Sequence, residues 1–396
     1  MLTVLKQYPS GVNLLLASAF VLTLGRAITL PYLVLYLSKH YQLSIAAVGT
    51  TVGCALVAGS LLSLYGGYLT DRLKPYPLIL GFTGCFVAAF IGMCVTSNLI
   101  LFFLALVLFN FAYSVIDITA KAAFGRLLPS HEQSRVFSLR YTLINMAYAV
   151  GPFIGAALAG VNMSLPFVLS AALGAGFFWL YIRYGDRELG CAPAQTTPFS
   201  FAQVGKVLLN DRRLVCFTLG GILSAVVFGQ FSAYLSQYLV VTSDPQRVYS
   251  VITTLLAVNA CGVITLQYWV GKRIDSQHLT RWLMAGLALF LAGLAGFSMA
   301  QSLTAWAFAM LLFTLGEIIV FPAEYMFIDR IAPASLRGMY FAAQNLSNLG
   351  GALGPIVCGL VLAVWPAPMM FYVLAGFLIV GGALYLLGGS LSETRR

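Results

Sequence analysis

Long apolar stretches follow one another along almost the whole chain and are separated by short polar segments. A helix that crosses a membrane needs about 20 mostly apolar residues, and twelve stretches meet this requirement. The pattern therefore predicts an all-α integral membrane protein with twelve transmembrane helices. The predicted spans are 12–38, 45–70, 76–96, 99–126, 137–160, 165–184, 213–240, 248–271, 280–299, 302–328, 338–362 and 368–388.

The first apolar run extends from about Gly11 to Ser38 and is too long for the apolar region of a signal peptide. It also lacks a cleavage site of small residues, so we interpret it as the first membrane helix. The longest polar connection, residues 185–212, divides the chain nearly in half. We therefore expect an N-terminal six-helix bundle at 1–184, a cytoplasmic linker at 185–212 and a C-terminal six-helix bundle at 213–396.

The two predicted bundles resemble each other in sequence. The fourth span aligns with the tenth at one constant offset, and the fifth aligns with the eleventh at an offset one residue shorter. The aligned residues are Phe109, Arg126 and Pro129 with Phe313, Arg330 and Pro333, and Asn145 and Gly151-Pro152 with Asn348 and Gly354-Pro355. Matching spans of the same orientation predict a parallel repeat, with the two bundles related by a pseudo-two-fold axis along the membrane normal.

Charged residues make up only 9% of the chain, whereas soluble proteins carry about 25%. The net charge of +10 does not indicate nucleic acid as a partner, because the basic residues form short clusters between apolar runs. With a cytoplasmic N-terminus, 18 of the 22 Lys and Arg residues fall on the cytoplasmic side, Lys39 and Arg247 lie outside, and Arg26 and Lys121 lie within the membrane. The positive-inside rule thus predicts an inner-membrane protein with both termini in the cytoplasm.

Metal, cofactor and nucleotide chemistry find no support in the residue pattern. The seven cysteines form no C-x-x-C pair, and most lie inside apolar runs, so we expect neither a disulfide framework nor a metal site. The three histidines lie in loops or at helix ends, and there is no Walker motif. We therefore expect a protein that is not an enzyme, holds no cofactor and uses no ATP.

Five charged residues stand clear of the predicted helix ends, namely Arg26, Asp117, Lys121, Glu317 and Glu324. Each costs about 2.5–3.5 kcal/mol at the bilayer centre on insertion scales, so such residues normally face a bundle interior or a wet cavity. Asp117 and Lys121 are four residues apart and share a helix face. Glu317 and Glu324 are two turns apart on one face.

The signs of these charges differ between the two halves of the chain. Arg26 and Lys121 lie in the first half, and Glu317 and Glu324 lie in the second. A cavity with one cationic and one anionic wall suits a zwitterion such as an amino acid or a dipeptide, so we expect a small-molecule substrate of that kind. Desolvation favours the neutral form of a carboxylic acid, so the candidates for proton exchange are, in order, Glu317, Asp117 and Glu324.

Two structural alternatives stay open for these charges. In the first alternative, Asp117 and Lys121 form an ion pair that has no further role. In the second, Glu324 belongs to a gate with Arg330 or Arg337.

Polar side chains at helical spacings add hydrogen-bonding capacity. Beside Arg26 and Lys121, the candidate substrate-binding residues are Tyr32, Tyr36, Tyr113, Asn145, Gln230, Tyr234, Gln237, Asn259 and Gln344.

Two local motifs carry a resemblance to a known family, the major facilitator superfamily. The segment Gly67-Tyr68-Leu69-Thr70-Asp71-Arg72-Leu73-Lys74-Pro75 resembles its loop motif G-x-x-x-D-R-x-G-R-R/K, with Lys74 at the usual glycine and Pro75-Tyr76 at the two basic positions. The segment Gly151-Pro152-Phe153-Ile154-Gly155-Ala156 resembles the tail of its antiporter motif, G-P-x-x-G-G. With two six-helix halves and a long central loop, the resemblance covers essentially the whole chain.

The resemblance implies a secondary transporter that works by alternating access, with a substrate cavity lined by spans one, four, seven and ten. It also implies that the aspartate of the loop motif caps a neighbouring helix and closes the cytoplasmic side, a use of the helix dipole. The residues that we expect to take part in gating are Gly67, Asp71, Arg72, Gly151, Pro152 and Arg330.

A narrower resemblance, through Leu24-Gly25-Arg26-Ala27-Ile28-Thr29-Leu30-Pro31-Tyr32, is to bacterial drug and small-peptide exporters of the same superfamily. We therefore expect a monomeric, proton-coupled antiporter in the lipid bilayer that exports small zwitterionic, dipeptide-like or drug solutes. One alternative is a proton-coupled symporter that imports small peptides or sugars. Another, from a different class, is a channel or a membrane receptor that transports nothing.

Overall fold

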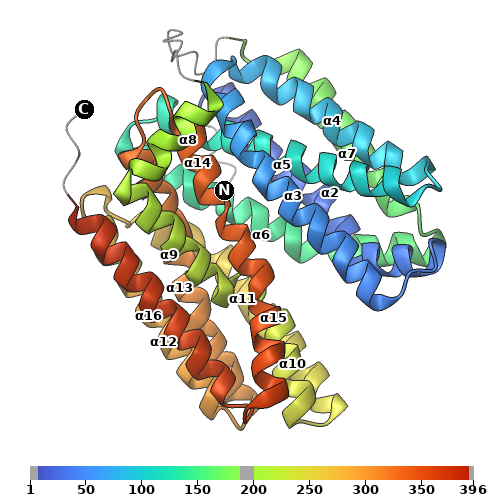
Figure 1. Cartoon of the computed structure of the whole chain (residues 1–396), viewed down its shortest axis with the longest axis vertical. Coiled ribbons are helices and arrows are strands. Elements are labelled where there is room, and N and C mark those ends of the chain that lie inside the picture. The colour runs from blue at the N-terminus through green and yellow to red at the C-terminus, as the bar shows by residue number, and fades with distance from the viewer. Residues whose placement is uncertain (1–7, 188–199, 392–396) are drawn as a thin grey trace. The chain divides into compact units, whose positions relative to one another are not determined.

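The computed structural model describes residues 8–187 and 200–391, and this part of the chain contains helices and no strand (Figure 1). The longer helices are α2 (Ser10–His40), α3 (Ile45–Arg72), α4 (Pro75–Val95), α5 (Leu99–Leu127), α6 (Ser130–Val161), α7 (Leu165–Tyr184), α11 (Pro245–Gly271), α12 (Leu279–Met299), α13 (Leu303–Ile331) and α16 (Met369–Ser390). The shorter ones are α8 (Phe201–Asn210), α9 (Arg212–Phe228), α10 (Phe231–Thr242), α14 (Arg337–Asn345), α15 (Ser347–Val364) and the 3-10 helix η1 (Ser276–His278).

Within the described residues, 11 helical spans are long and apolar enough to cross a membrane, and α9 with α10 makes a twelfth as one bent span. The predicted all-α membrane architecture of twelve spans is therefore confirmed. The predicted seventh span is broken between α9 and α10, which meet at 43°. Gly229 lies at the break, where a Cβ would be 2.5 Å from the Cα of Gly351 on α15 and 2.6 Å from the Ala225 carbonyl oxygen. Only glycine fits this close approach.

Side-chain caps fix several helix starts. Asn98 Oδ1 accepts hydrogen bonds from the backbone N–H groups of Ile100 (2.8 Å) and Leu101 (3.2 Å) before α5. Ser302 caps α13 in the same way, because a free first-turn N–H needs an acceptor. The α6 helix begins at Ser130, seven residues before the predicted 137, since its first turns are polar and hydropathy does not detect them.

The described helices form two compact units. The first unit consists of Met1–Pro129, Thr142–Pro198 and Pro333–Ala342. In it, α5 packs against α3 and α4, and α7 packs against α4 and α2. Phe86, Phe90 and Phe109 meet in its core, with ring centroids 4.9–5.6 Å apart.

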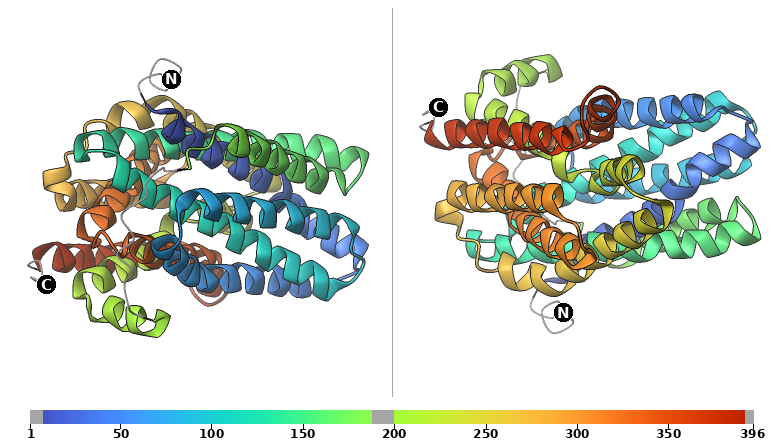
Figure 2. Two further views of the ribbon diagram at one scale, coloured as in Figure 1. Left: turned by 90° about the horizontal axis from the view of Figure 1, so that it is seen from above. Right: turned by 90° about the horizontal axis from the view of Figure 1, so that it is seen from below.

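The second unit consists of Ser130–Tyr141, Phe199–Ala332 and Ala343–Arg396. In it, α13 packs against α12 and α11, and α9 packs against α16 and α15. Figure 2 shows from two sides that the helices of each unit run alongside one another as a bundle. The aromatic core of this unit includes Phe290 and Phe313, with ring centroids 4.6 Å apart.

Each unit contains a short segment from the other half of the sequence. The start of α6, Ser130–Tyr141, belongs to the second unit, while the rest of α6 belongs to the first. Conversely, Pro333–Ala342, which includes the start of α14, belongs to the first unit. We call these two stretches the exchanged segments. The predicted domain limits of 1–184 and 213–396 stay a prediction, and residues 188–199 of the predicted linker lie outside the described part of the chain.

Candidate functional site

The predicted pair Asp117 and Lys121 is an ion pair on α5. Lys121 Nζ lies 2.9 Å from Asp117 Oδ2, and the two side chains are 3% and 13% exposed, respectively. The spacing of four residues brings the two side chains to one helix face. The charge of Lys121 is therefore already balanced within α5.

Arg26 on α2 has a different surrounding. Its Cζ lies 4.9 Å from the ring centroid of Tyr113 on α5, a cation–π distance. The Tyr113 hydroxyl in turn shares a hydrogen bond of 2.8 Å with Thr23 Oγ1. Arg26 Nε is buried and has no hydrogen-bond partner, so this guanidinium retains capacity to bind an anionic group.

Glu317 on α13 is a buried carboxyl group surrounded by neutral donors. Tyr141 Oη on α6 donates a hydrogen bond to its Oε1 (2.5 Å), and Asn259 Nδ2 on α11 donates one to its Oε2 (2.6 Å). Asn259 Nδ2 also lies 3.2 Å from Thr314 Oγ1. No lysine or arginine of the described residues forms an ion pair with Glu317. Its charge therefore has no fixed counter-charge.

Glu324 lies two turns further along α13 and is also buried. Its Oε1 accepts a hydrogen bond from Tyr385 Oη on α16, and Gln344 Nε2 on α14 lies 3.5 Å from its Oε2. The two glutamates of one helix face thus have separate partners on different helices. The predicted candidate Gln344 takes part in this second cluster.

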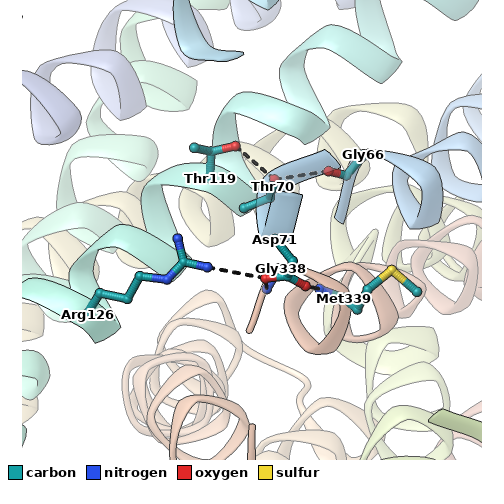
Figure 3. A network of polar contacts seen from close by, with 7 residues as sticks. All are labelled: Gly66, Thr70, Asp71, Thr119, Arg126, Gly338 and Met339. Carbon is teal, nitrogen blue, oxygen red and sulfur yellow. Dashed lines mark hydrogen bonds and ion pairs between the residues drawn. The ribbon is translucent and has the colours of Figure 1, made fainter. Parts of the chain in front are cut away.

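Asp71 at the end of α3 holds the exchanged segment of the first unit (Figure 3). Its two carboxylate oxygens accept the backbone N–H groups of Gly338 (2.7 Å) and Met339 (2.9 Å) in the first turn of α14. Arg126 Nη2 on α5 lies 3.2 Å from Asp71 Oδ1. A carboxylate at a helix N-terminus is stabilised by the helix dipole, and Arg126 balances its charge.

Close backbone contact accompanies this cap. A Cβ on Gly67 would lie 2.6 Å from the Gly338 carbonyl oxygen, and one on Gly338 would lie 2.5 Å from the Gly67 carbonyl oxygen. Thr70 ties α3 to α5 through a hydroxyl contact of 3.0 Å with Thr119. The absence of side chains on both glycines is what lets α14 approach near enough for Asp71 to cap it.

The other exchanged segment makes several neutral contacts within the second unit. Ser134 Oγ donates a hydrogen bond to the carbonyl oxygen of Gly271 at the end of α11. The Tyr141 ring stacks on Phe321 of α13 with centroids 4.5 Å apart and packs in a core cluster with Val263 and Ile318. The hydroxyl of the same tyrosine makes the bond to Glu317.

The remaining candidates of the first half lie mostly in packing positions. Tyr32 Oη donates a hydrogen bond of 2.9 Å to the carbonyl oxygen of Pro152, which lies inside α6, and Gly151 contacts Ala27 of α2 closely. Tyr36 is buried in an aromatic cluster with Phe102 and Phe167. Arg72 is exposed over the Tyr68 ring, and Asn145 is half-buried on α6.

The remaining candidates of the second half are similarly dispersed. Gln230 is exposed at the break between α9 and α10. Tyr234 is fully buried and its hydroxyl has no hydrogen-bond partner, and Gln237 is half-buried with its Oε1 unpartnered. Arg330 Nη1 donates to the carbonyl oxygen of Ser276 at 3.2 Å.

Sequence reasoning missed Tyr141, Arg140 and Asp329, which are all buried. The guanidinium of Arg140 lies 5.7 Å from the Tyr325 ring centroid. Because hydropathy sets the predicted fifth span at 137, Arg140 counted as a residue of the cytoplasmic end. The available signal was that Arg140 and Tyr141 lie inside the predicted fifth span, 137–160, and continue its helical pattern.

A second missed feature is a degenerate copy of the Asp71 motif. Gly271 and Asp275 lie 204 residues after Gly67 and Asp71, the same offset that relates Arg126 to Arg330. Asp275, however, bonds locally to the Gln277 N–H (2.9 Å) and to His278 Nδ1 (2.6 Å), and its side chain is 47% exposed. The hydrogen bonds from Gln277 and His278 lower the pKa of Asp275. This copy caps no helix of the other half among the described residues.

Comparisons with known proteins identify the family. The family model described as Major Facilitator Superfamily matches residues 15–348. The chain is 38% identical to the uncharacterized MFS-type transporter YdeE of Escherichia coli strain K12, over 94% of each chain. It is 25% identical to a Na(+), Li(+), K(+)/H(+) antiporter of Planococcus maritimus over 96% of each chain. It is also 25% identical to the multidrug resistance protein MdtH of Klebsiella pneumoniae, over 87% of this chain and 84% of that one.

A solved structure shares the fold. The crystal structure of the transporter FucP in the outward conformation matches with a TM-score of 0.77 and 14% identity, over 96% of this chain and 99% of that one. The protein belongs to the major facilitator superfamily and is a multi-pass membrane transporter. The resemblance predicted from the loop motif and the repeat is thereby confirmed.

Proposed function

We propose that the protein is a proton-coupled antiporter that exports small organic solutes by alternating access, and that Glu317 carries the proton. The observation that carries this proposal is the surrounding of Glu317: it is buried, receives hydrogen bonds from the neutral donors Tyr141 and Asn259, and has no ion pair. A buried charge without a counter-charge is costly. A mobile proton removes that cost, so the group is suited to exchange one.

The other buried acids fit this role less well. Asp117 is balanced by Lys121 at 2.9 Å, whereas Asp71 serves as the cap of α14. A fixed cation beside a carboxylate favours its charged form and opposes proton uptake. We therefore propose Glu317 as the proton site, Glu324 as a second buried acid and Asp117 as a structural partner of Lys121.

For the solute, we propose that Arg26 binds an anionic group and that Tyr113 contacts the solute beside it. The unpartnered Nε of Arg26 and its position over the Tyr113 ring support this assignment. Because Lys121 is paired with Asp117, Arg26 is the better of the two cations for a solute carboxylate. A zwitterionic solute such as a dipeptide combines that carboxylate with an ammonium group that suits a buried acid.

The sequence relatives support antiport and export. One is named as an antiporter that exchanges cations for protons and another as a multidrug resistance protein. We propose that the transporter acts as a monomer in the inner membrane, since one chain supplies both units, with its termini in the cytoplasm. Reporter fusions at either terminus test this orientation, and activity of a periplasmic reporter would overturn it.

The test uses inverted membrane vesicles in which respiration acidifies the lumen and an acridine dye reports the pH gradient. We expect dye fluorescence to recover when a transported solute is added to the medium, because solute entry releases protons. Dipeptides, amino acids and lipophilic cations form the panel. Vesicles with Glu317→Gln should show no solute-dependent recovery at equal expression. A normal recovery in that variant would refute Glu317 as the proton site.

The same assay separates the importer alternative. A symporter moves protons and solute in the same direction, so only solute loaded inside the lumen would accelerate loss of the gradient. Asp117→Asn with Lys121→Gln removes both charges of the α5 pair without leaving a buried ion unpaired. We expect this double variant to retain solute-dependent recovery, whereas its loss would place the pair in the coupling mechanism.

A second candidate function, exchange of an alkali-metal cation for protons, is favoured by the donors around Glu317. One carboxylate near the hydroxyl oxygens of Thr314 and Tyr141 is a set of hard ligands with a single negative charge. The Planococcus relative is named for this activity. Recovery of fluorescence on addition of NaCl, LiCl or KCl, with none for the organic panel, would establish this function instead.

A further inference from the structure

The exchanged segment Ser130–Tyr141 ends at the residue that contacts the candidate proton site. Up to Tyr141, α6 belongs to the second unit, and from Thr142 onwards it belongs to the first. Tyr141 Oη donates a 2.5 Å hydrogen bond to Glu317 Oε1 within the second unit. Any motion that separates the exchanged segment from the second unit must break this bond.

Three further contacts of the segment join groups that are neutral at physiological pH. Ser134 bonds to a backbone carbonyl oxygen, Phe137 packs at 5.7 Å from the Tyr325 ring, and the Tyr141 ring stacks on Phe321. These contacts have the same strength whatever the pH. The bond to Glu317 differs, because a hydrogen bond to a charged acceptor is roughly twice as strong as one to a neutral acceptor.

Charged groups also lie on the elements packed around Glu317. On α6, Arg140 lies over the Tyr325 ring at 5.7 Å. On α13 itself, Glu324 accepts a hydrogen bond from Tyr385, and the buried Asp329 lies twelve residues after Glu317. The helices packed on α13 carry arginines in their first turns, at Arg212 and Arg213 of α9, Arg247 of α11 and Arg281 of α12. Of these, Arg213 lies over the Phe327 ring of α13 at 5.8 Å.

We propose that Tyr141 is the positioning residue through which the protonation state of Glu317 controls release of the exchanged segment Ser130–Tyr141. This proposal rests on the proposed proton site at Glu317. The charged carboxylate of Glu317 accepts a hydrogen bond from the Tyr141 hydroxyl, and this bond holds the segment in the second unit. When the carboxyl group takes a proton, the bond becomes a neutral one, and the segment leaves more readily.

The direction of this effect agrees with antiport. A proton must bind Glu317 while the segment is held, and it must leave Glu317 after the segment is released. Each proton then drives one change of conformation. Release that required a charged Glu317 would instead oppose proton entry. The Tyr141 hydroxyl thus links the chemistry of one buried acid to the motion of a whole helix.

The test measures the distance between spin labels at Arg135→Cys on the segment and Gln277→Cys after α11, in a protein without the seven native cysteines. Both positions are exposed and lie in the second unit. Lowering the pH from about 8 to about 5 should decrease the ratio of held to released segment by about tenfold, as expected when a charged hydrogen bond becomes neutral.

Three variants separate the possible outcomes. Tyr141→Phe keeps the ring on Phe321 and removes only the hydroxyl, so the ratio should lose its pH response. Glu317→Gln should lose it too and remain on the released side. Tyr148→Phe makes the same change at an exposed position of α6 and should respond as the wild type. A purely structural role of Tyr141 would lower the ratio equally at every pH and leave the response intact.

The outcome for Tyr141 is distinguishable from that for the proposed function. If Tyr141→Phe keeps the wild-type pH response while Glu317→Gln abolishes gradient-driven transport, the role of Tyr141 is refuted and the proton site stands. If Glu317→Gln keeps gradient-driven transport, the proposed function fails. Should Tyr141→Phe not fold, wild-type distances that ignore pH would still overturn the proposal.

Discussion

The two exchanged segments are held in their units by different chemistry. Pro333–Ala342 is held by a fixed charge, since the carboxylate of Asp71 caps α14 and is balanced by Arg126. The contacts of Ser130–Tyr141 include ring packing, a serine hydroxyl, the Arg140 guanidinium over the Tyr325 ring, and one bond to Glu317, an acid without a fixed counter-charge. The first hold joins a carboxylate to backbone N–H groups and a guanidinium, whereas the second joins a carboxyl group to a neutral hydroxyl.

The repeat in the sequence makes this difference more informative. Gly271 and Asp275 occupy the positions that Gly67 and Asp71 occupy 204 residues earlier, so both units carry the same two residue types. Asp275 turns to its own loop, bonding to Gln277 and His278. The exchanged segment Ser130–Tyr141 is therefore held in the second unit by other contacts along α6. The Tyr141–Glu317 hydrogen bond is the contact at the last residue of that segment.

The largest expected effect comes from removing the fixed charge. Asp71→Ala removes the cap of α14 and leaves the partly buried Arg126 without this carboxylate, a change that costs about 3–5 kcal/mol for a buried pair. The matched change Asp275→Ala removes an exposed cap of η1 and should cost less, about 0.5–2 kcal/mol. Equilibrium unfolding in mixed micelles measures both variants. Equal losses of stability would show that the two copies of the motif hold their segments alike.

A smaller effect is expected from filling the close contact between α3 and α14. In Gly338→Ala, the added Cβ would lie 2.5 Å from the Gly67 carbonyl oxygen and 2.7 Å from Thr70 Cβ, and overpacking of this kind costs about 1–3 kcal/mol. Gly205→Ala on α8, where a Cβ meets no atom within 4 Å, is the control. The same unfolding measurement reports both, and a neutral Gly338→Ala would mean that α14 can shift without losing its cap.

The smallest effect is expected for the serine that holds the other segment. Ser134→Ala removes one neutral hydrogen bond to the Gly271 carbonyl oxygen, which contributes about 0.5–1.5 kcal/mol. The held-to-released ratio from the spin labels should fall by the same amount at every pH. An altered pH response in Ser134→Ala would contradict the assignment of that response to Tyr141 and Glu317.

Hydropathy was sufficient to predict the all-α fold and its membrane spans, because each span is long and apolar along its own sequence. The pair Asp117 and Lys121 was also predictable, since a spacing of four residues on a helix brings side chains together. The break at Gly229 was not, because it depends on the approach of Gly351 from a distant helix.

The partners of the buried acids could not be derived from the sequence for the same reason. Tyr141 and Glu317 are separated by 176 residues, and Asp71 and Gly338 by 267. Nothing local in the chain marks Tyr141 as a donor, whereas the loop motif did mark Asp71 as a capping residue. The role of Glu317 thus follows from its tertiary surroundings, and its presence inside a span is all that the sequence reveals about it.

In this account, a proton on Glu317 weakens the hold on the exchanged segment Ser130–Tyr141. One pH titration of two spin-labelled proteins tests it most directly, with Arg135→Cys and Gln277→Cys in one, and Lys74→Cys and Ala334→Cys in the other. Protonation weakens the bond at Glu317, so lowering the pH from about 8 to about 5 should lengthen the first distance. In Glu317→Gln, the first distance should lose this response, and the second distance should respond as in the protein with Glu317. A first distance that does not change with pH, or one that changes equally in Glu317→Gln, would contradict the account.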